Sequence, residues 1–145
     1  MTVRPISGRG TELRRWNSSS GAWEKLAQVK SITGPGMSRE TLDTTTLDTT
    51  GGYRTFIAGL RDAGEISFAM NWYRDGYDLM KADFESDVEA NYEIVLPDDE
   101  KTTLEFAGLV TAIPMTIPEG VVEANVTIKI SGEVTIESGS GPSPG

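Results

Sequence analysis

GEISFAMNW, residues 64–72, is the stretch that decides the fold, because apolar and polar or small residues alternate along it. Ile66, Phe68, Met70 and Trp72 form its apolar row. A period of two predicts a β-strand with one buried and one wet face. The run from Val122 to Glu137 alternates in the same way, and only Gly132 interrupts its apolar row. We expect the two strands to share one sheet.

The run from Val122 to Glu137 is unusually long for a strand. At about 3.3 Å per residue it would span roughly 50 Å, whereas strands usually hold about five or six residues. Gly132 has no side chain to pack, and a glycine inside a strand often marks a bulge or a corner. The strand therefore either bends at Gly132 or serves an assembly larger than one subunit.

The composition excludes several classes of protein. A chain of 145 residues is one domain by length and can bury a core of its own. It has no Cys, so it has no disulfide, and no His, which removes the usual general base and the commonest metal ligand. Sequence motifs for nucleotide binding, nucleophilic hydrolysis and zinc binding are missing too. Paired carboxylates, as in a glycoside hydrolase, stay formally open, but no spacing singles out a pair. We predict that the protein is not an enzyme and uses no cofactor or metal.

Nothing in the sequence indicates export or membrane insertion. The N-terminus, MTVRPISGRG, lacks the apolar segment of a signal peptide. No stretch approaches the roughly 18 apolar residues that would span a bilayer. We expect a soluble protein that is made in a cytoplasm and does not enter a membrane.

The net charge of −9 is distributed unevenly along the chain. Residues 1–30 carry a net +4, residues 31–82 a net −2, and residues 83–145 a net −11. The acidic half could not wrap nucleic acid, because cations that neutralise phosphates dominate DNA binding. It could attract the basic end of another copy, which would steer head-to-tail association. A solvated acidic surface that serves only solubility is the other interpretation.

The remaining elements follow from the same kinds of pattern. We predict an arm over 1–10, strands over 11–16 and 22–32, a helix over 75–88, a strand hairpin from 91–96 and 103–113, and a Gly/Ser/Pro-rich tail over 138–145. Trp16 and Trp23 should pack together across the first pair of strands. Asp75 should cap the helix, whose packed face would be Tyr77, Met80, Phe84 and Val88.

Residues 37–63 are the least ordinary segment. They hold a tandem repeat, TLDTT followed by TLDTT, and then a glycine pair with several large apolar residues. A five-residue repeat would put Leu42 and Leu47 on opposite faces of a strand, so they could not both enter one core. We predict a loop, and its apolar side chains require a covering surface. That surface is either the chain's own sheet or a neighbouring subunit.

These features resemble a known family. A basic hairpin precedes a Thr/Asp stretch from Glu40 to Asp48, followed by Gly52-Tyr53-Arg54 and by FIAGLRDAG over 56–64. A strand that ends in Asn71-Trp72, a short helix and a Pro114-Met115-Thr116 segment before the long last strand complete the pattern. This order resembles the major tail tube proteins of long, non-contractile-tailed bacteriophages, over about residues 10–137.

The resemblance implies a fold and an assembly. The fold would be mainly β, a small antiparallel β-sandwich or barrel with one flanking α-helix and a long inter-subunit loop, similar to the tube protein of type VI secretion systems. The chain would divide into an arm (1–10), a tail tube domain (11–137) and a tail (138–145). Subunits would close into rings, six to a ring, through their sheet edges, and rings would stack into a hollow tube that conducts DNA into the host.

The resemblance also implies roles for particular residues. The candidates for contact between subunits or rings are Arg14, Arg15, Thr44, Asp48, Tyr53, Arg54, Phe56, Ile57, Leu60 and Arg61. The candidates for the lumen wall are Glu65, Ser67, Asn71, Lys129, Ser131 and Glu133. An acidic lumen would repel phosphates, so DNA would pass without specific binding.

The partners that the resemblance implies are other copies of the chain, a tape measure protein, a tail terminator and a tail-tip initiator. The location would be the virion tail, after synthesis in the cytoplasm of a bacterial host. A different class of protein also stays open: a monomeric carbohydrate- or ligand-binding β-sandwich that would use Trp16, Trp23, Trp72 or Tyr73 as stacking surfaces.

Overall fold

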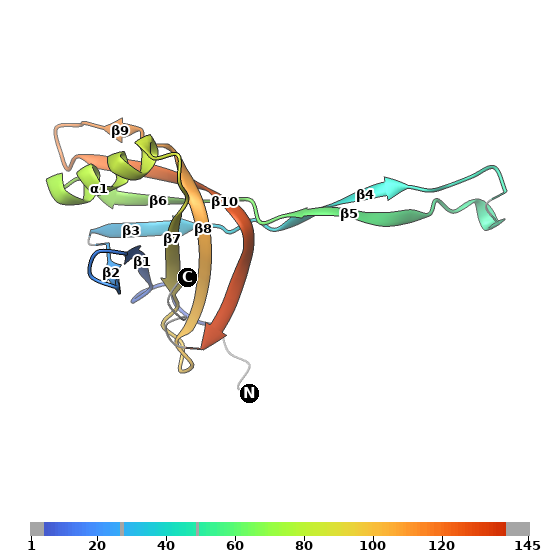
Figure 1. The fold of residues 1–145 in the computed structure, drawn as a ribbon, viewed down its shortest axis with the longest axis horizontal. Helices are drawn as coiled ribbons and strands as arrows, with labels where there is room; N and C mark the ends of the chain where they lie inside the picture. The colour runs from blue at the N-terminus through green and yellow to red at the C-terminus, as the bar shows by residue number, and fades with distance from the viewer. Residues whose placement is uncertain (1–4, 27, 49, 139–145) are drawn as a thin grey trace.

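The structure is a computed structural model that describes residues 5–26, 28–48 and 50–138. A curved β body carries one flanking helix, and one long hairpin projects from it (Figure 1). The elements in chain order are β1 (Glu12–Asn17), β2 (Ala22–Lys25), β3 (Val29–Thr33), β4 (Ser38–Asp43), the short 3-10 turn η1 (Thr50–Gly52), β5 (Phe56–Asp62), β6 (Glu65–Asn71), α1 (Arg74–Glu85), β7 (Ala90–Val95), β8 (Thr102–Ala112), β9 (Met115–Thr116) and β10 (Glu123–Ser138).

The body is one antiparallel sheet in the order β2-β1-β7-β8-β10-β6-β3, with β9 paired to β10. The predicted mainly-β fold with one flanking helix is confirmed for the described residues. The strands predicted over 64–72 and 122–137 are β6 and β10, and they pair with each other from Glu123↔Asn71 to Lys129↔Glu65. The predicted hairpin of 91–96 and 103–113 is β7 and β8.

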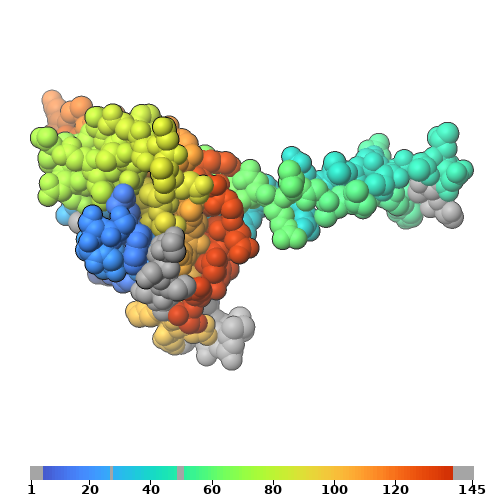
Figure 2. All heavy atoms as spheres, in the orientation of Figure 1, coloured from blue at the N-terminus to red at the C-terminus, as the bar shows by residue number. Residues whose placement is uncertain are grey.

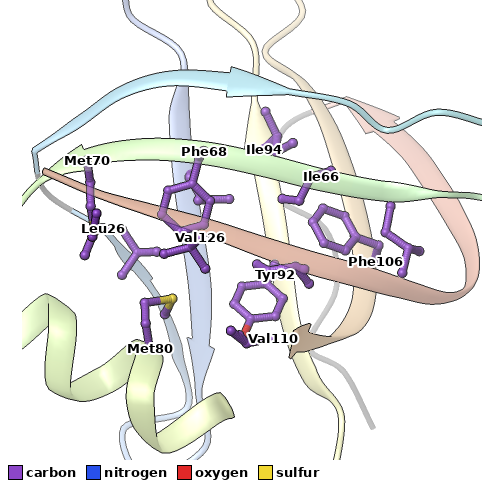
Figure 3. Packing of buried hydrophobic residues seen from close by; sticks show 14 of the residues in the cluster. Leu26, Ile66, Phe68, Met70, Met80, Tyr92, Ile94, Phe106, Val110 and Val126 are labelled. Atoms are coloured by element: carbon purple, nitrogen blue, oxygen red, sulfur yellow. The ribbon is translucent and has the colours of Figure 1, made fainter. Parts of the chain in front are cut away.

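The core lies on the apolar faces of β6, β7, β8 and β10, where the alternation in the sequence predicts it (Figure 3). Ile66, Phe68 and Met70 of β6 are at most 2% exposed. Opposite them along β10, Ala124, Val126 and Ile128 are fully buried. Burial of this row removes apolar surface from water, which is the dominant favourable term in folding.

β10 bends along its length, because its two halves pair with different strands of the sheet (Figure 1). Its first half pairs with β6, and its second half pairs with β8 as far as Ser138↔Thr102. Between Ser131 and Thr135 the register with β8 shifts, and Gly132 has φ +85°. The expected break at Gly132 is therefore a bulge, in a conformation that glycine adopts readily.

The helix differs from its prediction in its cap and in its packed face. Tyr73 is the N-cap and makes no side-chain cap hydrogen bond, while Asp75 lies in the first turn, near the positive end of the helix dipole. Met80 is buried, but Phe84 and Val88 are exposed, so the predicted four-residue stripe is only partly core. The buried face instead includes Asp83, which a pattern of apolar residues cannot reveal.

Asp83 joins the helix to the sheet through hydrogen bonds. Arg15 Nε and Nη2 donate to its two carboxylate oxygens at 2.7 and 2.6 Å, and the Tyr92 hydroxyl donates to Oδ2 at 2.6 Å. Burial raises the pKa of Tyr92, and the Asp83 carboxylate raises it further, so the phenol stays protonated as a donor. The bond to Asp83 likewise raises the pKa of Arg15. A buried charge is tolerated when it is paired and hydrogen-bonded in this way.

The prediction of a single strand over 22–32 is wrong, because this segment forms two strands that lie at opposite edges of the sheet. β2 pairs with β1, and β3 pairs with β6. Between them Leu26 is buried and Gln28 has φ 62°, so the chain turns into the core instead of continuing. Trp16 and Trp23 pack edge to face with ring centroids 5.3 Å apart, as predicted.

The loop predicted over 37–63 is also wrong, because this segment is the hairpin β4–β5. Its register runs from Ser38↔Asp62 to Asp43↔Phe56, and the Thr44 N–H donates to the Thr55 carbonyl beyond the strands. The hairpin does not fold over the sheet; it projects away from the body (Figures 1 and 2). Thr41 in β4 and Phe56 and Ile57 in β5 are residues that suit a pleated strand, whereas the glycine pair lies in the turn between the strands.

The division of the chain into arm, domain and tail stays a prediction. Residues 5–11 form no helix or strand, and residues 1–4 and 139–145 lie outside the described part. Within the described residues, no helix is long and apolar enough to cross a lipid bilayer.

Candidate assembly surface

The β4–β5 hairpin exposes large apolar side chains that its own chain does not cover. Leu60 and Tyr53 are 80% and 79% exposed, and Leu42, Phe56 and Ile57 are each just over half exposed. Figure 2 shows the hairpin as a thin projection that the rest of the chain does not surround. Large apolar side chains gathered on one exposed segment mark an interaction site.

The two faces of the hairpin differ in chemistry. Between two successive register pairs, β4 advances by two residues, from Arg39 to Thr41, while β5 advances by three, from Arg61 to Ala58. The extra residue is a bulge on β5, so the side chains of β4 alternate strictly between the two faces. Since register partners share a face, one face holds Arg39, Arg61, Thr41, Ala58, Asp43 and Phe56. We call it the cationic face. The opposite face holds Leu42 and Ile57 with Ser38, Glu40 and Asp62.

Two exposed arginines, Arg39 and Arg61, are direct register partners on the cationic face. Like charges directly opposite in a sheet destabilise the pair. Among the described residues, no carboxylate lies within 4.0 Å of either guanidinium or of Arg54 farther along the hairpin. Arg39 was not predicted, because a segment interpreted as a loop has no register.

The far part of the hairpin is held by polar contacts. The Thr44 and Thr55 hydroxyls lie 3.0 Å apart, and the Thr45 N–H donates to Asp43 Oδ1 at 2.8 Å. The bonds from Thr45 lower the pKa of Asp43. Of the predicted contact residues here, Thr44 thus braces the hairpin itself, while Asp48 is exposed.

A groove of about 930 Å³ separates the base of the hairpin from the second half of β10. Met37, Leu60 and Val134 provide apolar lining, and Arg39, Arg61, Glu40, Asp62 and Glu133 provide charges. Here β6 has already turned away into the hairpin, so among the described residues β10 pairs only with β8 from Thr135 to Ser138. An unpaired strand edge is a ready template for another chain.

Arg14 and Arg15, predicted as contacts with a neighbour, form ion pairs within their own chain. Arg14 contacts Glu12 at 2.6 Å and Glu93 at 3.4 Å, and Arg15 holds Asp83. Any contact with a neighbour would be additional to these pairs. The asymmetry of charge in the sequence gave no sign of this internal pairing.

The predicted lumen residues lie along β6 and β10. The register sets Glu65, Ser67 and Asn71 of β6 across from Lys129, Thr127 and Glu123 of β10. Lys129 Nζ contacts both Asp62 oxygens, at 3.0 and 3.2 Å. Ser131 continues this outer face, whereas Glu133 lies within the bulge.

The outer face of β7, β8 and the second half of β10 carries a row of carboxylates. Glu93 and Glu105 are direct register partners, and Glu105 also faces Thr135, two residues before Glu137. Burial raises the pKa of the Glu105 carboxyl, and the charges of Glu137 and Glu93 raise it further. Neither Glu105 nor Glu137 was predicted as a contact residue.

The aromatic residues of the alternative, a carbohydrate-binding module, do not form a flat stacking surface. The Trp16 and Trp23 rings cross at 70°, and Trp72 lies 6.0 Å from Tyr77. In the described part of the chain, no group of three or more acidic residues is placed to hold a metal ion. In the turn between β7 and β8, the Asp98 carboxylate accepts hydrogen bonds from the N–H and the hydroxyl of Thr102.

Comparison with known proteins gives a family and a fold. The family profile of the lambda phage tail tube protein matches residues 8–137. No curated protein sequence matches the chain.

Three solved structures illustrate the shared fold. The tail of an empty GTA particle, refined with C6 symmetry, is 20% identical, with a TM-score of 0.76 over 92% of this chain and 99% of that chain. The extended sheath–tube complex of the PVC extracellular contractile injection system is 13% identical, with a TM-score of 0.70 over 92% of each chain. The SPP1 tail tube is 13% identical, with a TM-score of 0.69 over 93% of this chain and 80% of that chain.

Proposed function

The chain belongs to the lambda phage tail tube protein family, and we propose that six copies of it close into a ring and that such rings stack into a hollow tube. It is a structural protein of the virion tail, and it assembles with copies of itself. The finer description, with the ring number, the lumen wall and the partners at the tube ends, is our proposal.

The observation that carries the proposal is the β4–β5 hairpin. Its exposed apolar residues, with Leu60 and Tyr53 the most exposed, lose contact with water only if another molecule covers them. The open edge of β10 at the base of the hairpin offers a second place for association. A surface that one chain leaves uncovered and that every copy carries suits a repeating assembly. The C6 symmetry stated for the GTA tail supports six copies in a ring.

The candidate contact residues of the hairpin are Thr44, Asp48, Tyr53, Arg54, Phe56, Ile57, Leu60 and Arg61. We assign the contact with neighbouring subunits or rings chiefly to this set, because all lie on the projecting segment. Arg14 and Arg15 contribute only in addition to their internal ion pairs.

The lumen wall is proposed to be the outer face of β6 and the first half of β10, with Glu65, Ser67, Asn71, Lys129, Ser131 and Glu133. The net charge of −9 favours a wall that repels phosphates, so that DNA passes without specific binding. Lys129 is paired with Asp62, which reduces its positive charge toward a passing strand.

Three further parts of the proposal rest on the family. A tape measure protein would fill the lumen before DNA, a terminator would close the upper end, and a tail-tip initiator would start polymerisation. The chain would be made in the cytoplasm of a bacterial host. We also propose that it catalyses no reaction, since a conduit needs a wall and not a reactive group.

Electron microscopy of the concentrated protein tests the proposal. We expect hollow rings or tubes with six-fold symmetry and a hole wide enough for duplex DNA. The variant Leu60→Asp should abolish them, because it places a charge on the covered surface. The matched control is Val88→Asp, which changes another exposed apolar residue, 76% exposed, outside the hairpin and should leave assembly intact. A wild-type sample that stays monomeric even with tail-tip extract, or rings of another symmetry, would contradict it.

A further inference from the structure

The cationic face of the hairpin holds three successive pairs of residues, or levels, between Arg39 and Asp43 of β4, which are four residues apart. The first level is Arg39 with Arg61, the second is Thr41 with Ala58, and the third is Asp43 with Phe56. The order along the face is therefore paired cations, small side chains, and an acid beside an aromatic ring. Four residues of strand span about 13 Å.

The outer face of β8 and β10 holds three levels with the complementary order. The first is Glu105 with Thr135, adjoined by Glu137; the second is Ala107 with Ser131; the third is Leu109 with Lys129. Glu105 and Leu109 are four residues apart on β8, the same spacing as Arg39 and Asp43 on β4. We call this surface the acidic strip.

Each surface is unfavourable by itself and would be improved by the other. Arg39 and Arg61 repel each other, as do Glu105 and Glu137. At the opposite end, Asp43 with Phe56 would meet Lys129 with Leu109, and Leu109 is 37% exposed. Cations would meet carboxylates at one end, apolar groups would meet at the other, and small residues would allow close approach between them.

Among the described residues, Arg39 and Arg61 of the cationic face and Glu105 and Glu137 of the acidic strip form no ion pair, whereas Lys129 of the strip contacts Asp62 of its own chain. No carboxylate of the described residues lies within 4.0 Å of Arg39 or Arg61, although Glu133 and Glu40 line the same groove. The hairpin projects away from the sheet that carries the acidic strip (Figure 1). A nucleic acid could also neutralise the arginines, but it offers no match to the apolar level, so a second copy fits better.

We propose that the cationic face of the β4–β5 hairpin docks on the acidic strip of a second copy, with Arg39 and Arg61 beside Glu105 and Glu137, and with Phe56 beside Leu109. This inference rests on the proposed self-assembly and names its surfaces. The contact would take Lys129 and Ser131 out of the proposed lumen wall, which would keep Glu65, Ser67, Asn71 and Glu133.

Cysteine crosslinking tests the contact directly, because the chain has no Cys of its own. A mixture of the single variants Phe56→Cys and Leu109→Cys should form a disulfide between copies under mild oxidation, identified by mass spectrometry of the linked peptides. The control mixture pairs Phe56→Cys with Val88→Cys, at the exposed end of the helix region. We expect at least about tenfold more linked product in the first mixture, since a disulfide needs its Cβ atoms within about 4.5 Å.

Charge reversal tests the cationic level independently. Arg39→Glu with Arg61→Glu, or Glu105→Lys with Glu137→Lys, should each raise the concentration needed for tube formation by at least about tenfold, and the two sets combined should restore most of it. Arg74→Glu with Lys81→Glu makes the same change in net charge as the hairpin pair, on the exposed helix, and should have little effect. Circular dichroism verifies that each variant is folded.

The outcomes separate this inference from the proposed function. Wild-type tubes without the Phe56–Leu109 crosslink, or without restoration by the combined reversal, would overturn the docking and leave the tube intact. Binding of labelled duplex DNA that is lost in Arg39→Glu with Arg61→Glu would identify a nucleic acid as the partner and overturn the docking as well. Absence of any wild-type ring or tube would overturn both proposals together.

Discussion

Phe68 and Phe56 are the same kind of residue twelve positions apart, yet one is 2% exposed and the other 52%. The body around Phe68 covers its own apolar side chains and pairs its buried charges, as Arg15 does with Asp83. The hairpin around Phe56 does neither. The difference teaches that the body is complete as a single chain, whereas the hairpin is completed only by another molecule.

This contrast predicts that the same substitution will have opposite consequences in the two regions. Changes in the body should lower the stability of the subunit and affect assembly only through folding. Changes in the hairpin should leave the subunit stable and affect assembly alone. Each prediction below tests one part of this contrast.

The largest expected effect is that of Phe68→Ala. Removal of a fully buried phenylalanine should lower the free energy of unfolding by about 4 kcal/mol, because it leaves a cavity in the core. Phe56→Ala should change that free energy by less than about 0.5 kcal/mol, but should weaken tube formation. Urea unfolding of both variants, followed by fluorescence, gives the comparison. A similar loss for both would contradict the distinction between the regions.

Asp83→Ala should have the next largest effect. It leaves the buried hydroxyl of Tyr92 and the largely covered guanidinium of Arg15 without their shared acceptor, at a cost of about 3 kcal/mol. Asp78→Ala on the same helix removes only the exposed pair with Arg74 and should cost less than about 0.5 kcal/mol. Thermal or urea unfolding measures both. Equal costs would mean that the Asp83 network contributes no more than a surface pair.

Gly64→Ala tests the junction between the two regions. Gly64 has φ +80°, and a Cβ there would collide with the carbonyl oxygen of Gly36 in the other leg of the hairpin. We expect backbone strain to cost about 1–2 kcal/mol and the collision to add to that loss. Gly21→Ala, also at positive φ but with open space around it, is the control that separates strain from collision. Identical losses would show that the collision is relieved without cost.

The smallest effect concerns pH and Glu105. Because burial raises its folded pKa above the ordinary 4.5, ionisation costs the folded chain stability as the pH rises through that folded value. Glu105→Gln should therefore be more stable than the wild type at pH 7, and the difference should vanish below pH 4.5. Unfolding curves across this range measure it. A difference that grows toward acid would reverse the assigned direction of the pKa shift.

The sequence was informative wherever the chain buries its own residues. The period of two in β6 and β10 predicted both strands and their common sheet, and the glycine in the apolar row made a break at Gly132 one of two alternatives. The apolar stripe of the helix predicted Met80 but not Asp83, because the partner of Asp83 lies 68 positions away in Arg15. Distant pairing of this kind leaves no local pattern.

The hairpin was the least predictable segment for a related reason. Its exposed residues on both faces lack the one-sided alternation that marks a half-buried strand, so the pattern over residues 37–63 predicts a loop. The candidate residues Tyr53, Phe56, Ile57 and Leu60 were found from their apolar character alone. Arg39, Glu105 and Glu137 depend on strand register and could be recognised only in three dimensions.

The crossing at which the hairpin leaves the body limits which substitutions can change the direction of the hairpin. A Cβ on Gly34 would lie 2.5 Å from the carbonyl oxygen of Glu65, and one on Gly64 would collide with Gly36, so the two legs meet backbone to backbone. The direction of the projection therefore depends on main-chain atoms, which substitutions do not alter. Substitutions at surface residues should therefore leave the direction of the hairpin unchanged. Substitutions at Gly34 or Gly64 are the exception, because an added Cβ would collide with the backbone at the crossing.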